Sequence, residues 1–192
     1  MPRPPASDGP GTRERLLSVA HAHLVARGYH GLSLHDIAAE VGIRKASLYH
    51  HYPGGKDHLV ADALAHALGR IGDAFDAAIA VEETTRGRLV AVARWMRTQD
   101  AATARVLRDA SGRVPEADIA RLAGLFVERM VRPLRRVIDD GVARGELRPH
   151  DAELSSALCL GLLTDLAEVP GLQGRPHLEE DVVDLFLRGV GA

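Results

Sequence analysis

The sequence has few aromatic residues, a single cysteine and no long apolar run. Aromatic residues make up 4% of the 192 residues, while alanine and leucine are abundant, and this composition favours helix over sheet. The single cysteine, Cys159, excludes an intramolecular disulfide and is typical of the reducing cytoplasm. The longest apolar run, at 157–163, has seven residues, too few to span a bilayer. We therefore expect a cytoplasmic helical protein without a membrane segment.

The chain also lacks an overall excess of basic residues, since its formal net charge is −2. Residues 1–58 carry seven Lys/Arg and five Asp/Glu, a net charge of +2, and residues 59–192 carry 17 and 21, a net charge of −4. Both lysines, Lys45 and Lys56, and seven of the ten histidines lie in the first part. This distribution weakly indicates an anionic partner at the N-terminal end. A slightly basic surface without a ligand explains the charge alone equally well.

Apolar residues recur at helical spacing along most of the chain, and we find no alternating strand pattern. Residues 1–11 hold four prolines and two glycines and no apolar signal segment, so we expect a flexible arm there. Pro133 should kink or interrupt the helix that contains it. The predicted fold class is all-α, with helices at 12–28, 34–41, 45–51, 56–80, 84–98, 101–111, 116–143, 151–168 and 178–189.

Two of these helices are short and follow one another closely, as in a helix-turn-helix. Ser33 precedes the first, where its hydroxyl can cap the free N–H groups together with Asp36 three residues on. Gly42 ends this helix, and the glycines after Pro53 end the next. Helices this short are marginal alone, so the helix at 12–28 should pack across both.

The segment from His50 to Lys56 could also be taken for a phosphate-binding loop or for a metal site, but the spacing of its residues argues against both. A phosphate loop requires Ser or Thr after the lysine and a strand before the turn, whereas Asp57 follows Lys56 and a helix precedes it. His50 and His51 are adjacent, so on a helix they point about 100° apart, a poor arrangement for a metal. We also find no nucleophile elbow and no H-E-x-x-H motif. The sequence therefore predicts no catalytic residue, no metal site and no cofactor, although an enzyme built on a helical bundle stays an alternative.

A DNA-binding helix explains the same segment better. The second helix of a helix-turn-helix lies in the major groove, so its outward side chains should be polar while Leu48 faces inward. Lys56 begins the next helix, where its ammonium and the free backbone N–H groups can hold a phosphate. The alternative is a structural three-helix unit with solvated charges. The side chains available outward on the second helix are Lys45, Ser47, Tyr49, His50 and His51.

Residues 12–60 closely resemble the DNA-binding domain of the tetracycline-repressor (TetR/AcrR) family of bacterial regulators. The resemblance rests on the RGY turn at 27–29, the DIA core at 36–38, the VGI turn at 41–43, LYHHY at 48–52, and Lys56. It implies a homodimeric, ligand-responsive transcriptional regulator that binds a palindromic operator. We expect this regulator to be a repressor. The resemblance also implies a DNA-binding domain at 12–58 and a C-terminal ligand-binding and dimerisation domain at 59–192. A small molecule in that second domain would shift the helix at 56–80 and release the operator.

The resemblance also implies where the sites lie. The chain departs from the family pattern in three places: at Arg44, at His21 and His23, where the family usually has apolar residues, and in the turn at 53–56, which is one residue longer than the commonest one. Family members usually place a small capping residue where this chain has Arg44, so the second helix loses a cap and gains a cation. This departure keeps open a degenerate member that binds a small molecule or protein but no specific DNA. The expected DNA contacts are Ser33, Arg44, Lys45, Ser47, Tyr49, His50, His51 and Lys56. The expected pocket residues are Trp95, Met96, Phe126 and Met130, which are adaptable apolar side chains on central helices; an ordinary place in the core explains each of them equally well. The expected dimer contacts are Leu158, Leu162, Val182, Val183, Phe186 and Leu187.

Overall fold

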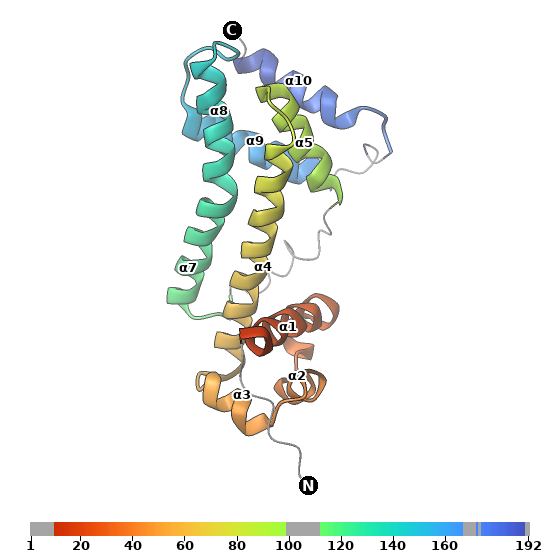
Figure 1. Cartoon of the computed structure of the whole chain (residues 1–192), viewed down its shortest axis with the longest axis vertical. Coiled ribbons are helices and arrows are strands. Elements are labelled where there is room, and N and C mark those ends of the chain that lie inside the picture. The colour runs from red at the N-terminus through yellow and green to blue at the C-terminus, as the bar shows by residue number, and fades with distance from the viewer. Residues whose placement is uncertain (1–9, 99–111, 167–171, 173, 191–192) are drawn as a thin grey trace. The chain divides into compact units, whose positions relative to one another are not determined.

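The computed structural model describes residues 10–98, 112–166, 172 and 174–190, and these residues are almost entirely helical (Figure 1). The all-α prediction is confirmed, and no extended strand forms within these ranges. The predicted helix at 101–111 lies outside the described residues. The elements in chain order are α1 (Pro10–Gly31), α2 (Leu34–Val41), α3 (Lys45–His51), α4 (Gly55–Ala80), α5 (Thr85–Thr98), α7 (Glu116–Phe126), the π-helix η1 (Val127–Val131), α8 (Arg132–Ala143), α9 (Ala152–Leu166) and α10 (Leu178–Val190).

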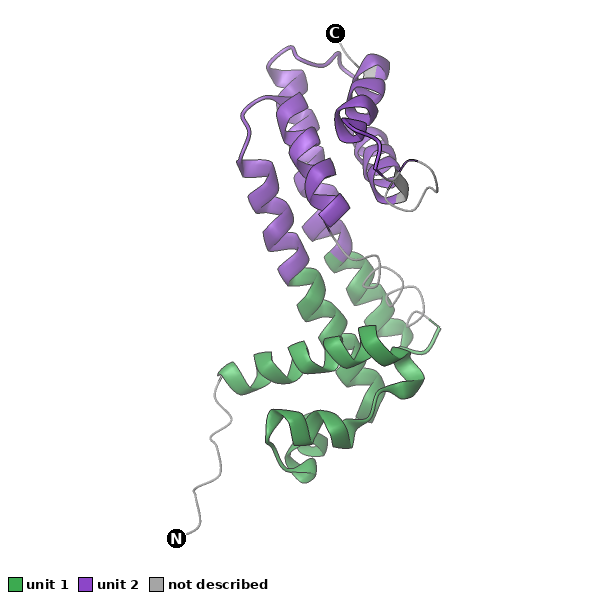
Figure 2. Ribbon diagram, turned by 90° about the vertical axis from the view of Figure 1, so that its right-hand side faces the viewer, with its two compact units in different colours: residues 1–69, 102–125 green, residues 70–101, 126–192 purple. Residues whose placement is uncertain are grey.

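The helices divide into two compact units, shown in different colours in Figure 2. Unit 1 comprises the described residues within 1–69 and 102–125, and unit 2 those within 70–101 and 126–192. Unit 1 therefore holds α1, α2, α3, the first part of α4 and most of α7. The remainder of α4 belongs to unit 2 together with α5, η1, α8, α9 and α10.

Unit 1 is built around one apolar core. Leu24 of α1, Ile37 of α2 and Leu48 of α3 are each 1% exposed or less, and Leu59 and Leu64 of α4 complete the centre of the same cluster. One face of each short helix is therefore enclosed, and the opposite face is left to solvent. This is the packing that helices of two turns need in order to be stable.

The end of α1 is set by Gly28. This residue has φ 67° and ψ 178°, which is not helical, so the helix stops there and residues 29–31 form a separate turn. A positive φ is easily reached only by glycine, and the predicted stop at Gly28 is confirmed. The helix begins at Pro10, two residues before the predicted start, and residues 1–9 of the expected arm lie outside the described residues.

Unit 2 has a second core and a break in its longest predicted helix. Phe75 of α4, Val92 of α5 and Leu134 of α8 are fully enclosed at its centre. The predicted helix at 116–143 is interrupted ahead of Pro133 by η1, where the N–H of Arg132 bonds to the carbonyl of Val127, five residues back. Because proline lacks an N–H and its ring crowds the carbonyl four residues earlier, the wider π-turn lets the chain enter α8, as expected for Pro133.

Candidate nucleic-acid interface

The geometry of α2 is fixed by a cap at each end. The Ser33 hydroxyl accepts a hydrogen bond from the N–H of Asp36 at 3.3 Å, so the predicted N-cap is confirmed. The Asp36 carboxylate pairs with Arg27 at 3.3 Å, which ties α2 to the end of α1. Gly42 adopts φ 79° and donates its N–H to the carbonyls of Ala38 and Ala39. These bonds set the turn that leads into α3.

Helix α3 begins without such a cap. Arg44 occupies the N-cap position in an extended conformation, and its side chain makes no capping hydrogen bond. Leu48 is 0% exposed in the unit 1 core, as predicted, and so it fixes which face of α3 is turned outward. Helix α3 is therefore held mainly by its buried face.

The outward face of α3 carries most of the residues expected to contact DNA. Arg44, Lys45, Tyr49, His50 and His51 are exposed, and Ser47 is half-buried. Tyr49 is 44% exposed, and the Lys45 ammonium lies 5.6 Å from its ring centroid. The His50 and His51 rings meet edge to face at 5.8 Å. The result is a short polar and aromatic face on one rigid helix. Ser33, by contrast, is half-buried, and its hydroxyl accepts the hydrogen bond that caps α2.

Lys56 occupies the start of α4, directly after Gly55, whose φ is 72°. Its ammonium donates to the carbonyl of His30 at 3.4 Å and lies 4.6 Å above the ring centroid of Tyr29. Burial lowers the pKa of Lys56, against the opposing effect of Asp57. The lysine is thus half-enclosed and held by the end of α1, close to the free N–H groups of α4.

Tyr29 contacts both Lys56 and Asp57 of α4. In the sequence it stands out only as part of the RGY turn that resembles the family. Its hydroxyl donates to the Asp57 carboxylate, and this bond is the largest cause that raises the pKa of Tyr29, ahead of burial. The guanidinium of Arg113, which precedes α7, lies 5.4 Å from the Tyr29 ring centroid. The sequence gave no sign of Arg113, because its partner is far away along the chain.

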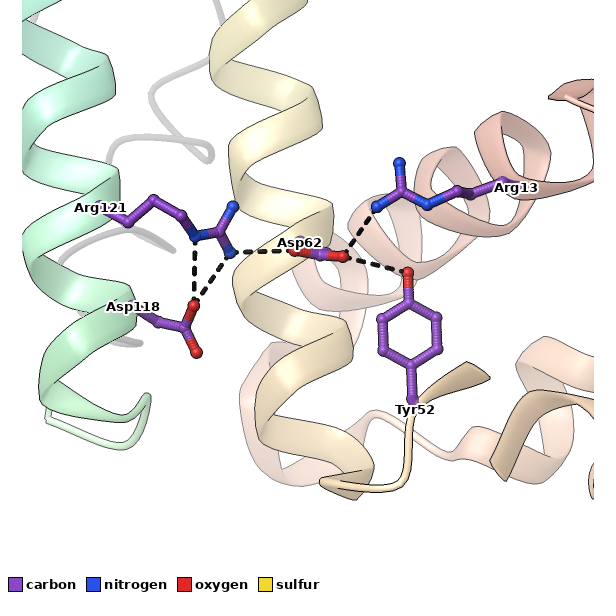
Figure 3. Close-up of polar contacts among 5 residues, drawn as sticks. All are labelled: Arg13, Tyr52, Asp62, Asp118 and Arg121. Carbon is purple, nitrogen blue, oxygen red and sulfur yellow. Dashed lines mark hydrogen bonds and ion pairs between the residues drawn. The ribbon is translucent and has the colours of Figure 1, made fainter. Parts of the chain in front are cut away.

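A second cluster in unit 1 centres on Asp62 of α4 (Figure 3). Its carboxylate accepts hydrogen bonds from Arg13 of α1 at 2.9 Å, from the Tyr52 hydroxyl at 3.3 Å and from Arg121 of α7 at 2.9 Å. Arg121 also bonds to Asp118, at 3.0 and 3.2 Å. The sequence carried one sign of this cluster, since Asp62 is an acidic residue inside an apolar segment, between the buried Ala61 and Ala63.

The residues expected to line an effector pocket all lie in unit 2. Trp95 packs edge to face on Phe75 with ring centroids 5.6 Å apart, Met96 is half-buried against the same core, Met130 is 5% exposed and Phe126 is 40% exposed. A pocket of about 330 Å³ opens between the described parts of α4, α5 and α8. It is lined by Asp76, Ile79, Ala80, Arg88, Pro133, Arg136, Val137 and Asp140.

Helix α9 presents an apolar stripe that includes two of the expected dimer contacts. Leu158 and Leu162 are 56% and 48% exposed, and Leu154, one turn earlier, is 58% exposed. On α10, Val183 is buried in the unit 2 core. Leu185, which the sequence analysis did not select, is 68% exposed. The other expected contacts on α10, Val182, Phe186 and Leu187, pack partly against the core.

Comparison with known proteins identifies the fold and the family. The model of a family described as bacterial regulatory proteins, tetR family, matches residues 16–63, the segment that holds α2, α3 and the start of α4. The N-terminal part of the chain, about a quarter of its length, therefore matches the TetR family. The family consists of regulatory proteins, which agrees with the prediction that the chain is not an enzyme.

Similarity to individual TetR-family proteins is strongest in the N-terminal part. The HTH-type transcriptional regulator LmrA from Bacillus subtilis (strain 168) is 43% identical over 53 residues, and the match spans only 28% of this chain and 28% of LmrA. A TetR-family regulator from Mesorhizobium loti superposes with a TM-score of 0.76 at 19% identity, covering 97% of this chain and 100% of that one. The structure of AibR in complex with isovaleryl coenzyme A and operator DNA gives 0.59 at 22% identity, covering 92% and 97%. Both structures show the same fold.

Within the described ranges, no helix combines the length and apolar character needed to cross a membrane. In the same part of the chain, no group of three or more His, Cys, Asp or Glu side chains is arranged to hold a metal ion.

Proposed function

We propose that this chain is a cytoplasmic, homodimeric transcriptional repressor that binds a palindromic DNA operator and releases it when a small molecule binds unit 2. The observation that carries the proposal is the outward face of α3. Exposed Lys45, Tyr49 and His50 lie there on a helix whose opposite face is locked by Leu48. A short helix with donors and aromatic rings on its free face is what reading base edges in a major groove requires.

Phosphate contacts would come from Arg44, Lys56 and the hydroxyl of Ser47. Lys56 lies in the first turn of α4, where the backbone N–H groups have no partner within the helix. Its contacts with the His30 carbonyl and the Tyr29 ring hold it in place before DNA arrives. An ammonium that is already ordered loses less side-chain entropy on binding a phosphate.

Dimerisation would use the apolar stripe of α9 together with α10. Leu154, Leu158 and Leu162 follow one another at single-turn spacing and are all about half exposed or more. A continuous exposed apolar stripe of this kind is typical of an interface, and two such helix pairs from two subunits form a four-helix bundle. A dimer would present two α3 helices, as a palindromic operator requires.

The effector site is proposed to lie in unit 2. The pocket between α4, α5 and α8 has a volume within the range of small-molecule sites. The residues predicted from the sequence to line the effector site stay candidates for it: Trp95, Met96, Phe126 and Met130. The related fold of AibR was determined with both an acyl coenzyme A and operator DNA, which supports a regulator that responds to a ligand.

The test is to select a random double-stranded oligonucleotide pool on the purified protein and to titrate the selected sequences against salt. We expect a palindrome with half-sites about one helical turn apart and binding that weakens as salt rises. A folded dimer that enriches no sequence over non-specific DNA would contradict the proposal. That result would favour the alternative, a family member that binds a small molecule or protein without specific DNA recognition.

A further inference from the structure

Asp62 joins four helices of unit 1 through one carboxylate. It lies on α4 and accepts hydrogen bonds from Arg13 of α1, from Tyr52 at the end of α3 and from Arg121 of α7 (Figure 3). Its two oxygens are divided between the partners: Oδ2 receives Arg13 and Tyr52, and Oδ1 receives Arg121. One acidic side chain is thus the shared acceptor of three donors from three different helices.

Tyr52 is the member of this cluster that reaches the DNA-reading helix. It is the C-cap residue of α3, and its N–H bonds to the carbonyl of Leu48 at 2.9 Å. Tyr52 is 6% exposed, so its ring is packed in the core. Its hydroxyl is the one polar group of the side chain and needs a hydrogen-bond partner there. Because that partner is Asp62, the position of the last turn of α3 depends on where the carboxylate is held.

The strength of the ion pairs alone does not explain the arrangement. Arg13 and Arg121 are 67% and 44% exposed, and exposed ion pairs contribute little to stability. Arg121 is itself oriented by Asp118, one turn earlier on α7. The contribution of the cluster is therefore geometric: two guanidinium groups, one of them oriented by Asp118, hold the carboxylate where the buried tyrosine hydroxyl can donate to it.

We propose that Asp62 is a positioning residue for operator recognition, which sets the orientation of α3 through the Tyr52 hydroxyl and is itself held by Arg13 and Arg121. The inference rests on the proposed DNA-binding function. It assigns a role in recognition to residues of α4 and α7 that do not touch DNA themselves. Both helices continue along the chain into unit 2, so the same carboxylate lies on the covalent route between the effector unit and α3.

The experiment compares specific with non-specific DNA binding in four full-length variants. Tyr52→Phe removes only a hydroxyl, Asp62→Asn keeps the shape of the acceptor without its charge, and Arg121→Gln removes one of its supports. Arg132→Gln is the matched control, because Arg132 loses the same charge and an ion pair with Glu128 within unit 2. Each variant is titrated with the selected operator and with a scrambled duplex over a range of salt concentrations.

We expect Tyr52→Phe and Asp62→Asn to weaken operator binding about tenfold, the effect of losing a hydrogen bond to a charged group. Their binding to the scrambled duplex and its salt slope should change less than about twofold, because phosphate contacts do not depend on the fine orientation of α3. Arg121→Gln should weaken operator binding in the same direction, and less than additively with Tyr52→Phe. Arg132→Gln should bind both duplexes as the wild type does.

A folded Tyr52→Phe protein that binds the operator as tightly as the wild type overturns the inference. An equal loss on operator and scrambled duplex also overturns it, since that result reports general weakening rather than misplacement of α3. If Asp62→Asn does not fold, Tyr52→Phe decides the matter alone. Failure of the wild-type protein to select any operator overturns the proposed function itself, which separates the two outcomes.

Discussion

Large exposed apolar side chains are distributed very unevenly between the two units. Of those in the described residues, Tyr49 of α3 belongs to unit 1, and Val81, Phe126, Val127, Leu154, Leu158, Leu162 and Leu185 belong to unit 2. In unit 1, polar side chains also bond to one another across helices, as at Asp62 and Tyr29. Unit 2 has such bonds too, for example between Arg86 and Asp184. The two units therefore differ in their exposed apolar surface, which is concentrated in unit 2.

The two cores offer the strongest way to break this comparison. Leu48→Ala in unit 1 and Leu134→Ala in unit 2 each truncate a side chain that is 0% exposed, so each should lower the free energy of unfolding by about 2–5 kcal/mol. Only Leu48→Ala should also abolish operator recognition at temperatures where the protein stays folded, because the buried Leu48 side chain fixes the orientation of α3. Urea unfolding and operator titration measure the two effects. Equal loss of operator binding in both variants would show that α3 is not the reading element.

The apolar stripe of α9 gives the next largest expected effect. Leu158→Glu places a charge in the centre of the proposed interface, where it would be desolvated without a partner, so self-association should weaken by about 100-fold or more. Sedimentation over a range of concentrations measures it. Val81→Glu is the control, since Val81 is 74% exposed in the same unit and belongs to neither α9 nor α10. An unchanged dimer in Leu158→Glu would refute the interface.

The two helices of the DNA-reading motif differ in their caps, and exchanging the caps sharpens the contrast. Ser33→Ala removes the hydroxyl that accepts from Asp36 and should destabilise the protein by about 1 kcal/mol. Arg44→Ser supplies the missing cap of α3 and should stabilise it by a similar amount, about 1 kcal/mol, while operator binding weakens through loss of a cation. Unfolding in urea checks the stabilities. The interpretation of Arg44 fails if Arg44→Ser lowers stability.

The smallest expected effect concerns acid stability of unit 2. Hydrogen bonds from Arg144 and from the Thr85 N–H lower the pKa of Glu146 from 4.5 to about 2. Because the folded pKa is depressed, this carboxylate stabilises the fold above its unfolded pKa, and the contribution is lost as pH falls from 4.5 toward about 2. For a partly exposed pair it should not exceed about 1 kcal/mol.

Glu146→Gln tests this by unfolding in urea at neutral and at acid pH. The variant should be less stable than the wild type near neutrality, and the difference should vanish near the lower pKa. Glu83→Gln, at an exposed carboxylate of the same unit, is the control and should leave stability unchanged at both. A deficit in Glu146→Gln that persists in acid would contradict the pKa argument.

The sequence by itself determined most of the described helices, the cap of α2 and the resemblance of the N-terminal segment to the TetR family. The stop at Gly28, the cap by Ser33, the turn at Gly42 and the inward face of Leu48 were all predicted before the structure and confirmed by it. These features are local: they depend on helical periodicity, on positive φ at glycine and on hydrogen bonds that span three or four residues. Such signals are legible in a short window of sequence.

Only the tertiary structure decided which distant side chains meet. Asp62 bonds to Arg13 and Arg121 across 49 and 59 residues of chain, and Arg113 reaches the ring of Tyr29. The pocket between α4, α5 and α8 is likewise lined by residues that are far apart in the sequence, from Asp76 to Asp140. An arginine on a helix surface has many carboxylates within its reach in principle, and no local pattern selects among them. The choice is made when the cores pack and bring particular helix faces together.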